Sequence, residues 1–201
     1  DDTHLVVVAN VNNAGTGLSL ASDGTVADPE EDDELSVTGT LADEDGVSGA
    51  SPTYVWKRAG TAISGATSSS YTLVQADVST IISVVISYTD DESESNTITL
   101  TAASDVDNVN DAPTVASAIS DVSHAEDAAY SLDASGTCTD VDGDSLTYTI
   151  SGGPSTITAT TAGAISGTPV NADVGAHTIT VTCSDSALSA TDAYVLTVTN
   201  T

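Results

Sequence analysis

A short run of oxygen-bearing residues occurs twice in the chain. The first copy reads Asn10-Val11-Asn12-Asn13-Ala14, and the second reads Asp107-Asn108-Val109-Asn110-Asp111-Ala112-Pro113. Calcium takes six to eight oxygen ligands in flexible geometry, from carboxylates, Asn carbonyls, backbone and water. The second copy offers Asp107, Asn108, Asn110 and Asp111 within five residues. This pattern predicts a calcium-binding joint between two modules rather than a flexible tether.

Other carboxylates stand where they could complete this joint. Asp140 and Asp142 lie in a turn after a predicted strand, and Asp185 follows another strand end. Bare carboxylates about 4 Å apart repel by several kcal/mol at an effective dielectric near 20, and a divalent ion removes that repulsion. For any single Asp the alternative is an ordinary turn residue. The predicted calcium ligands are Glu30, Glu31, Asp77, Asp107, Asn108, Asn110, Asp111, Asp140, Asp142 and Asp185.

A second, weaker calcium site is predicted around the first copy of the run. Asp43, Asp45 and Asp90 would face Asn10 and Asn12. Asn13 stands where the second copy has Asp111, so this site carries less negative charge. It is also incomplete if it needs a preceding module.

Other chemistries find little support. Asp140-Val141-Asp142-Gly143-Asp144 begins like an EF-hand loop, but Ser145 and Ser151 occupy the positions that require Gly and Glu. The three histidines show no metal-ligand spacing. The sequence has no Gly-x-Ser-x-Gly elbow and no phosphate-binding loop. We therefore expect no enzymatic activity.

The charge of the chain excludes several partners. Its 201 residues include 30 Asp plus Glu against 2 Lys plus Arg, for a formal net charge of −28. Such a balance repels nucleic acids and anionic membranes. No apolar run is long enough for membrane insertion, and no signal peptide is recognisable, so the sequence reads as an excised piece. A solvated acidic surface and cation binding both fit the acidity.

The two cysteines, Cys138 and Cys183, stand two residues before Asp140 and Asp185. Alternation along a strand places each Cys on the same face as its Asp. If the two carboxylates converge on one ion, the two Cys should meet in the core. A disulfide is then expected, and it would indicate an oxidising compartment. The alternative is a pair of buried thiols.

The elements that must position these residues are short strands. Thr, Val, Ser and Ile alternate with period two, and Gly, Asp, Asn and Pro separate the runs, as in a sandwich. One helical turn is expected within 72–80, and Trp56 is expected to pack in the core. The predicted strands are 16–21, 35–41, 53–58, 71–74, 81–89, 96–103, 115–119, 128–138, 145–150, 156–159, 176–184 and 191–199.

The repeat divides the chain into modules of about 100 residues. We expect an all-β fold of two tandem Ig-like/cadherin-like β-sandwich domains joined by a short calcium-binding linker. Residues 1–13 are expected to be the last strand and linker of a preceding module, with the strand at 3–9, which could instead pair with the edge of the first module. The first module is predicted at 14–106, the linker at 107–113 and the second module at 114–201.

Both modules resemble known repeats. Leu41-Ala42-Asp43-Glu44-Asp45-Gly46, Tyr54-Val55-Trp56-Lys57-Arg58 and Ala76-Asp77-Val78 are similar to the Ig-like repeats of giant bacterial RTX-type surface adhesins. Asp140-Val141-Asp142-Gly143-Asp144, Ile165-Ser166-Gly167-Thr168-Pro169 and Asp173-Val174-Gly175 resemble the dystroglycan-type cadherin-like repeat. By resemblance to cadherin joints, the Glu near the first strand, the Asp-x-Asp turn and the late Asp are ligand positions. The linker departs from the cadherin pattern, so its individual ligand roles do not transfer.

The resemblance implies a structural role. We expect a calcium-rigidified stalk module of a secreted bacterial adhesin, extracellular and on the cell surface, which holds a binding domain away from the cell. Its partners would be neighbouring repeats of the same chain, with any host or surface ligand bound through other domains, and the chain would be monomeric. The alternative is a calcium-dependent module that itself binds sugar or peptide. An appendage of a secreted enzyme is a third possibility.

Overall fold

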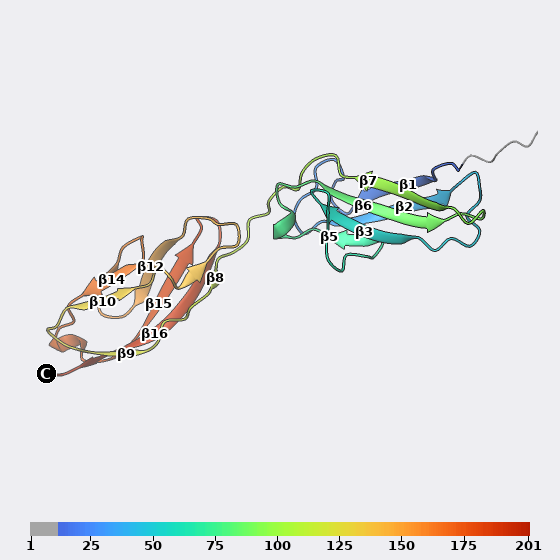
Figure 1. Ribbon diagram of the computed structural model, residues 1–201. Coiled ribbons are helices and arrows are strands. Elements are labelled where there is room, and N and C mark those ends of the chain that lie inside the picture. Colours follow the sequence, from blue (N-terminus) through green and yellow to red (C-terminus); the bar gives the residue numbers. More distant parts are fainter. Residues whose placement is uncertain (1–11) are drawn as a thin grey trace, which may run out of the picture. The chain divides into compact units, whose positions relative to one another are not determined.

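The computed structural model describes residues 12–201 and divides them into two compact units. Unit 1 ends at Val109 and unit 2 begins at Asn110, so the division falls inside the predicted linker at 107–113. Strands make up almost all of the regular structure, with two short 3₁₀ turns, η1 and η2 (Figure 1). The predicted ligand Asn10 and the predicted strand at 3–9 lie outside the described residues.

Unit 1 is a β-sandwich of two antiparallel sheets (Figure 1). The three-stranded sheet has the order β1-β2-β5, and the four-stranded sheet has the order β4-β3-β6-β7. The strands are β1 (Thr16–Ser22), β2 (Glu34–Ala42), β3 (Thr53–Arg58), β4 (Thr61–Ala62), β5 (Ser70–Thr72), β6 (Ile82–Thr89) and β7 (Ser95–Thr101), and η1 spans Gln75–Asp77.

The core of unit 1 lies between its two sheets. Along β6 every second side chain is buried, and Ile82, Val84 and Ile86 are fully buried. Trp56 from β3 is also fully buried, donates its indole N–H to the Ser68 carbonyl at 2.9 Å and stacks on Tyr71. The predicted core role of Trp56 is therefore confirmed.

Unit 2 is built from a four-stranded sheet of order β12-β15-β16-β9, a three-stranded sheet of order β10-β14-β13 and the pair β11-β8. The strands are β8 (Thr114–Val115), β9 (Val122–Ala125), β10 (Tyr130–Asp133), β11 (Cys138–Thr139), β12 (Thr147–Gly152), β13 (Ile157–Ala159), β14 (Ala164–Gly167), β15 (Gly175–Ser184) and β16 (Ser189–Thr199). The second 3₁₀ turn, η2, spans Asn171–Asp173.

The two longest strands of unit 2 supply much of its core. Ile179, Val181 and Cys183 alternate with more exposed residues along β15, as Tyr194 and Leu196 do along β16. Burial of about 1.5–3 kcal/mol per large apolar side chain explains why these strands hold their register. Both strands were predicted from the alternation, and the structure confirms them.

The short strands are where the predictions were wrong. The single strand predicted at 128–138 is two strands, β10 and β11, separated by a turn in which the Ser135 N–H donates to Asp133 Oδ1 at 2.9 Å. β4, β9 and β14 were not predicted at all. β9 pairs in parallel with β16. The paired residues are about 75 positions apart in the sequence, as Val198 is from His124. Four residues with little apolar alternation cannot reveal such a pairing.

Candidate metal centres at the ends of the units

An acidic loop follows directly after β11 in unit 2. The N–H of Asp142 donates to Asp140 Oδ1 at 2.9 Å, which folds the loop back on itself. One carboxylate oxygen each from Asp140, Asp142 and Asp144 lies within 4.8 Å of the others. Asp140 Oδ2 is buried and has no hydrogen-bond partner in the part of the chain that the structure describes. A buried anionic oxygen without a partner is costly, and a cation at this loop would satisfy it.

The start of unit 2 lies against this loop and against Asp185. The backbone N–H of Asp111 donates to Asp142 Oδ2 at 2.7 Å, and the Asn110 amide donates to Asp185 Oδ2 at 3.0 Å. Asp185 is buried, and its Oδ1 accepts the N–H groups of two residues in the turn that follows. The Asn110 amide and these backbone donors lower the pKa of Asp185 and keep it ionised. Unit 2 thus brings together five predicted ligands: Asn110, Asp111, Asp140, Asp142 and Asp185.

The predicted ligands of unit 1 at residues 30–31 and 107–108 also come together. Glu30 and Asp107 form a parallel β-bridge, and the N–H of Glu31 donates to the Asp107 carbonyl at 2.9 Å. Asn108 Oδ1 accepts from the Gln75 amide of η1 at 3.1 Å. Glu31 is buried, whereas Glu30 is exposed. One end of unit 1 therefore carries four predicted ligands.

Asp77 does not fit the ligand role predicted for it. Its side chain is fully buried, and its Oδ1 accepts from Arg58 Nε at 2.7 Å. Its Oδ2 accepts from the Tyr71 hydroxyl at 2.8 Å and from the Val74 N–H at 2.9 Å. Both oxygens are committed within unit 1, so we leave Asp77 out of the ligand set. Burial and then the Asp77 hydrogen bond raise the pKa of Tyr71 to about 12.

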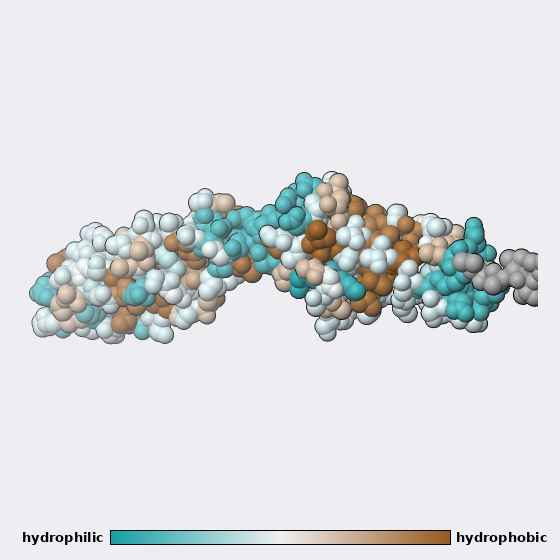
Figure 2. All heavy atoms as spheres, turned by 45° about the horizontal axis from the view of Figure 1, so that its top comes forward, coloured by the Kyte–Doolittle hydropathy of each residue, from teal (hydrophilic) through white to brown (hydrophobic). Residues whose placement is uncertain are grey.

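The second predicted site lies at the end of unit 1 where Asn12 and Asn13 meet the acidic loop after β2. Asn12, Asp45, Asp90, Glu92 and Glu94 line a cavity of about 140 Å³. The N–H of Asn13 donates to Asp45 Oδ2 at 3.2 Å. The structure therefore brings Asn12, Asp45 and Asp90 together as predicted and adds Glu92 and Glu94, which the sequence analysis missed. Figure 2 shows hydrophilic residues gathered at the ends of unit 1, with apolar residues on the flank between them.

Asp43 and Asp90 have protein partners at this end. Asp90 accepts two backbone N–H groups through Oδ1 and the Asn96 amide through Oδ2. Asp43 Oδ2 accepts from the Tyr88 hydroxyl at 2.5 Å, and that bond lowers the pKa of Asp43. Burial and then the same bond raise the pKa of Tyr88 to about 12. Asp43 therefore positions the loop that carries Asp45.

The hydrogen bond between Tyr88 and Asp43 predicts that unit 1 loses stability at high pH. The folded pKa of Tyr88, about 12, lies above its ordinary value of 10.0. The stabilisation is therefore fully present below about pH 10 and is lost as the pH rises towards about 12. We expect the melting temperature reported by Trp56 fluorescence to fall across this window, and Tyr88→Phe to remove part of the fall. Identical pH profiles for the variant and the wild type would contradict the prediction.

Glu126, at the far end of unit 2, is a candidate ligand that the sequence analysis missed. It is buried; its Oε1 accepts from the Thr201 N–H at 3.2 Å and from the Asn171 amide at 3.4 Å. Its Oε2 is buried without a hydrogen-bond partner among residues 12–201. The Asn171 amide also donates to Asn200 Oδ1 at 3.3 Å.

A repeated local structure could have revealed Glu126. In unit 1 Glu31 precedes Asp32, whose φ is 69°, and in unit 2 Glu126 precedes Asp127, whose φ is 56°. The sequence Val-x-Ala-Asp-Val accompanies both, at 74–78 and at 170–174, and forms η1 and η2. Aligning the two halves on these signals would have placed Glu126 opposite Glu31.

The two cysteines form the disulfide that was the first of the two predicted alternatives. Cys138 of β11 and Cys183 of β15 are bonded and both are buried.

Neither of the two 3₁₀ turns within residues 12–201 has the length and apolar character needed to span a membrane.

The sheets of the two units, with the family match over unit 2, define the class of protein as all-β, with Ig-like/cadherin-like β-sandwich domains. Residues 112–199, which make up most of unit 2, match the family model He_PIG, described as "Putative Ig domain". No curated protein matches the chain.

Several solved structures are similar in fold. Protocadherin gamma B2 extracellular cadherin domains 3–6 are 15% identical with a TM-score of 0.46, over 90% of this chain and 50% of that one. Drosophila N-cadherin EC1-4 is 13% identical with a TM-score of 0.38, over 96% and 52%. An endo-fucoidan hydrolase from glycoside hydrolase family 107 is 25% identical with a TM-score of 0.36, over 80% and 25%. The chain spans 25% to 34% of the length of the three fucoidan hydrolase chains it matches.

Proposed function

We propose that the chain is a pair of stalk modules whose joint is stiffened by calcium. The observation that carries this proposal is the buried, unpartnered Asp140 Oδ2 in a loop where three carboxylates converge. Oxygen-only donors in a flexible loop suit calcium better than metals that prefer nitrogen or sulfur. Bound calcium would supply the positive charge that holds these carboxylates together.

Unit 2 and unit 1 would each contribute ligands to the joint. From unit 2 these are Asn110, Asp111, Asp140, Asp142 and Asp185, with Asp144 as an addition. From unit 1 they are Glu30, Glu31, Asp107 and Asn108. Because Asp107, Asn108, Asn110 and Asp111 belong to the segment 107–113 itself, ions bound by these sets would restrict rotation about it. Extracellular modules bind calcium with dissociation constants of about 0.1–1 mM, so the joint would stiffen only after export.

The other ends of the units support a repeated arrangement. Asn12, Asp45, Glu92 and Glu94 at one end, and Glu126 with Asn200 at the other, are the groups that further joints would use. The partners would then be neighbouring repeats of the same chain, and the protein would work as a monomer without enzymatic activity. The domain type and the buried disulfide fit an extracellular protein. The resemblance to bacterial adhesin repeats leads us to place it at a bacterial cell surface, projecting a binding domain.

A sugar-binding role for the modules themselves is less well supported. Sugar sites commonly use exposed aromatic rings. In this chain Trp56 is fully buried, and Tyr88, Tyr130, Tyr148 and Tyr194 are buried as well. The remaining tyrosines, Tyr54 and Tyr71, are half-buried and pack against the core of unit 1.

Small-angle scattering tests the proposal. With about 10 mM calcium chloride, well above the expected dissociation constants, we expect a longer maximum dimension and a narrower distribution of shapes than with a chelator. Magnesium at the same concentration controls for ionic strength, since it prefers a stricter octahedral geometry and keeps several waters. Identical curves with calcium and with chelator would refute a calcium-dependent joint.

A further inference from the structure

The acidic loop of unit 2 is held unequally at its two ends. Its far end runs into β12, which pairs with β15 over six residues, whereas the end that carries Asp140 has a weak non-covalent attachment. It follows β11, whose two residues pair only with β8, through Cys138 opposite Val115 and Thr139 opposite Thr114. The loop itself, residues 140–146, contains no strand. A two-residue ladder is too short to fix the loop against the rest of the unit. The position of Asp140 must therefore depend on other connections.

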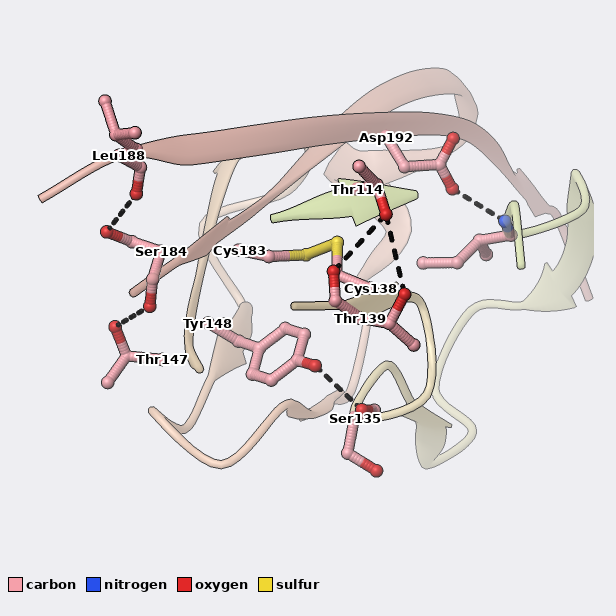
Figure 3. Close-up of a disulfide and its surroundings, with 11 residues drawn as sticks. Thr114, Ser135, Cys138, Thr139, Thr147, Tyr148, Cys183, Ser184, Leu188 and Asp192 are labelled. Carbon is pink, nitrogen blue, oxygen red and sulfur yellow. Dashed lines mark hydrogen bonds between the residues drawn. A yellow bond between two sulfur atoms is a disulfide. The ribbon is translucent and has the colours of Figure 1, made fainter. Parts of the chain in front are cut away.

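Asp185, by contrast, comes directly after the most extensively paired strand of unit 2. It follows β15, which pairs with β12 on one side and along its full length with β16 on the other. Asp140 and Asp185 are thus carried by different sheets, and each follows its cysteine by two residues. The disulfide joins these two sheets directly before the ligands (Figure 3). The Tyr148 hydroxyl, which donates to the Ser135 carbonyl at 2.7 Å, adds a non-covalent connection to the same segment.

In unit 1 the acidic loop is held to the neighbouring sheet by a hydrogen bond and not by a disulfide. Its acidic loop follows β2, and the Tyr88 hydroxyl of β6 donates to Asp43 in that loop. Leu41 and Tyr88 stand two residues before Asp43 and Asp90, as Cys138 and Cys183 stand before Asp140 and Asp185. In each unit a side chain two residues before the second Asp, Tyr88 or Cys183, therefore links the segment that carries the acidic loop to the neighbouring sheet. In unit 2 that link is covalent and can be broken by reduction.

We propose that the Cys138–Cys183 disulfide is a positioning device for the calcium ligands of unit 2, so that calcium binding and the disulfide stabilise each other. This inference rests on the proposed calcium site. The bond holds the Asp140 loop and Asp185 at the spacing the ion needs, and without it the ion must order the loop itself. Because coupling between two equilibria is reciprocal, bound calcium must protect the disulfide against reduction by the same factor.

Calorimetric titration of the two-unit chain tests the first half of this coupling. We expect the oxidised protein to bind calcium in unit 2 at least tenfold more tightly than Cys138→Ala/Cys183→Ala. Tyr194→Phe is the matched control: it removes the Tyr130–Tyr194 hydrogen bond in the core of unit 2, away from the acidic loop, and should leave calcium affinity unchanged. Equal affinities for the oxidised protein and the cysteine variant would overturn the proposal. Absence of calcium binding by the oxidised protein would instead refute the proposed function, and the coupling with it.

A second measurement needs no variant and holds even if the cysteine variant fails to fold. Dithiothreitol reduces the disulfide to two thiols and is itself oxidised to its cyclic disulfide. We expect the equilibrium constant for this reduction, read by thiol labelling at fixed ratios of reduced to oxidised dithiothreitol, to be at least tenfold lower with saturating calcium than with a chelator. Magnesium should lower it much less. Equal equilibrium constants with calcium and with chelator, in a protein that calorimetry shows to bind calcium, would overturn the coupling while leaving the calcium site in place.

Discussion

Asp140→Asn removes most of the calcium-dependent stabilisation of unit 2. At a calcium concentration about 100 times the dissociation constant, binding to the native state adds about 2.7 kcal/mol. For a domain of about 100 residues each kcal/mol corresponds to about 4–8 °C, so calcium should raise the melting temperature of wild-type unit 2 by about 10–20 °C. The variant loses one anionic ligand but keeps an oxygen to accept the Asp142 N–H, so its fold in chelator should be unchanged.

Calorimetry can follow this effect unit by unit. The only Trp of the chain lies in unit 1, so the transition that Trp56 fluorescence does not report belongs to unit 2. Asp133→Asn is the matched control. Asp133 accepts the N–H of the residue two positions on, as Asp140 does, but within residues 12–201 it belongs to no cluster of three carboxylates that could hold an ion. Asp133→Asn should keep the full calcium response; an equal loss of response in both variants would show that general charge, and not a site, is responsible.

The repeated run of Asn and Asp was enough to predict where the ligands gather. Asn110, Asp111, Asp140, Asp142 and Asp185 lie together because strands must end where the alternation ends, and acidic turns then meet at the end of a sandwich. The same reasoning paired Cys138 with Cys183. Long strands such as β6, β15 and β16 were predictable because a slip of one residue would expose their apolar side chains.

Asp77 shows where such reasoning fails. The sequence marks it as an acid near the end of unit 1, but its role depends on Arg58, which is 19 residues away on β3. Glu126 shows the opposite error: nothing next to it in sequence indicates a site. Only the distant match between Val-x-Ala-Asp-Val at 74–78 and at 170–174, and the buried Oε2 in the structure, distinguish it from a surface acid. Both cases are decided by which side chains become buried together, which a single sequence does not state.

The structure also gives a third use for the acidity, besides a solvated surface and cation binding. Many carboxylates accept backbone N–H groups in turns and between strands, and these hydrogen bonds stabilise the negative charge without any metal. Examples are Asp23, Asp33, Asp43, Asp90, Asp121, Asp133, Asp140, Asp185 and Asp192. An acidic residue in this chain is therefore the strongest candidate ligand where a buried oxygen remains without a hydrogen-bond partner among the described residues, as Asp140 Oδ2 does.

Asp77→Ala should destabilise unit 1 by about 3 kcal/mol, independently of calcium. Removing one partner of a buried ion pair typically costs about 3–5 kcal/mol, and the lower end applies because the Arg58 side chain is 30% exposed and can reach water. The Tyr71 hydroxyl and the Val74 N–H also lose their acceptor. The melting temperature reported by Trp56 fluorescence should fall by about 12–24 °C.

Asp173→Ala is the control for this effect. Asp173 occupies the same position in η2 and accepts the Val170 N–H at 2.9 Å and the Thr156 hydroxyl at 3.2 Å, and both of these donors are neutral. Its loss should cost unit 2 only about 1 kcal/mol, as for ordinary hydrogen bonds. If Asp77→Ala instead left the stability in chelator unchanged and abolished the response of unit 1 to calcium, Asp77 would be a ligand after all, and the Arg58 pair would not be what holds η1 against β3.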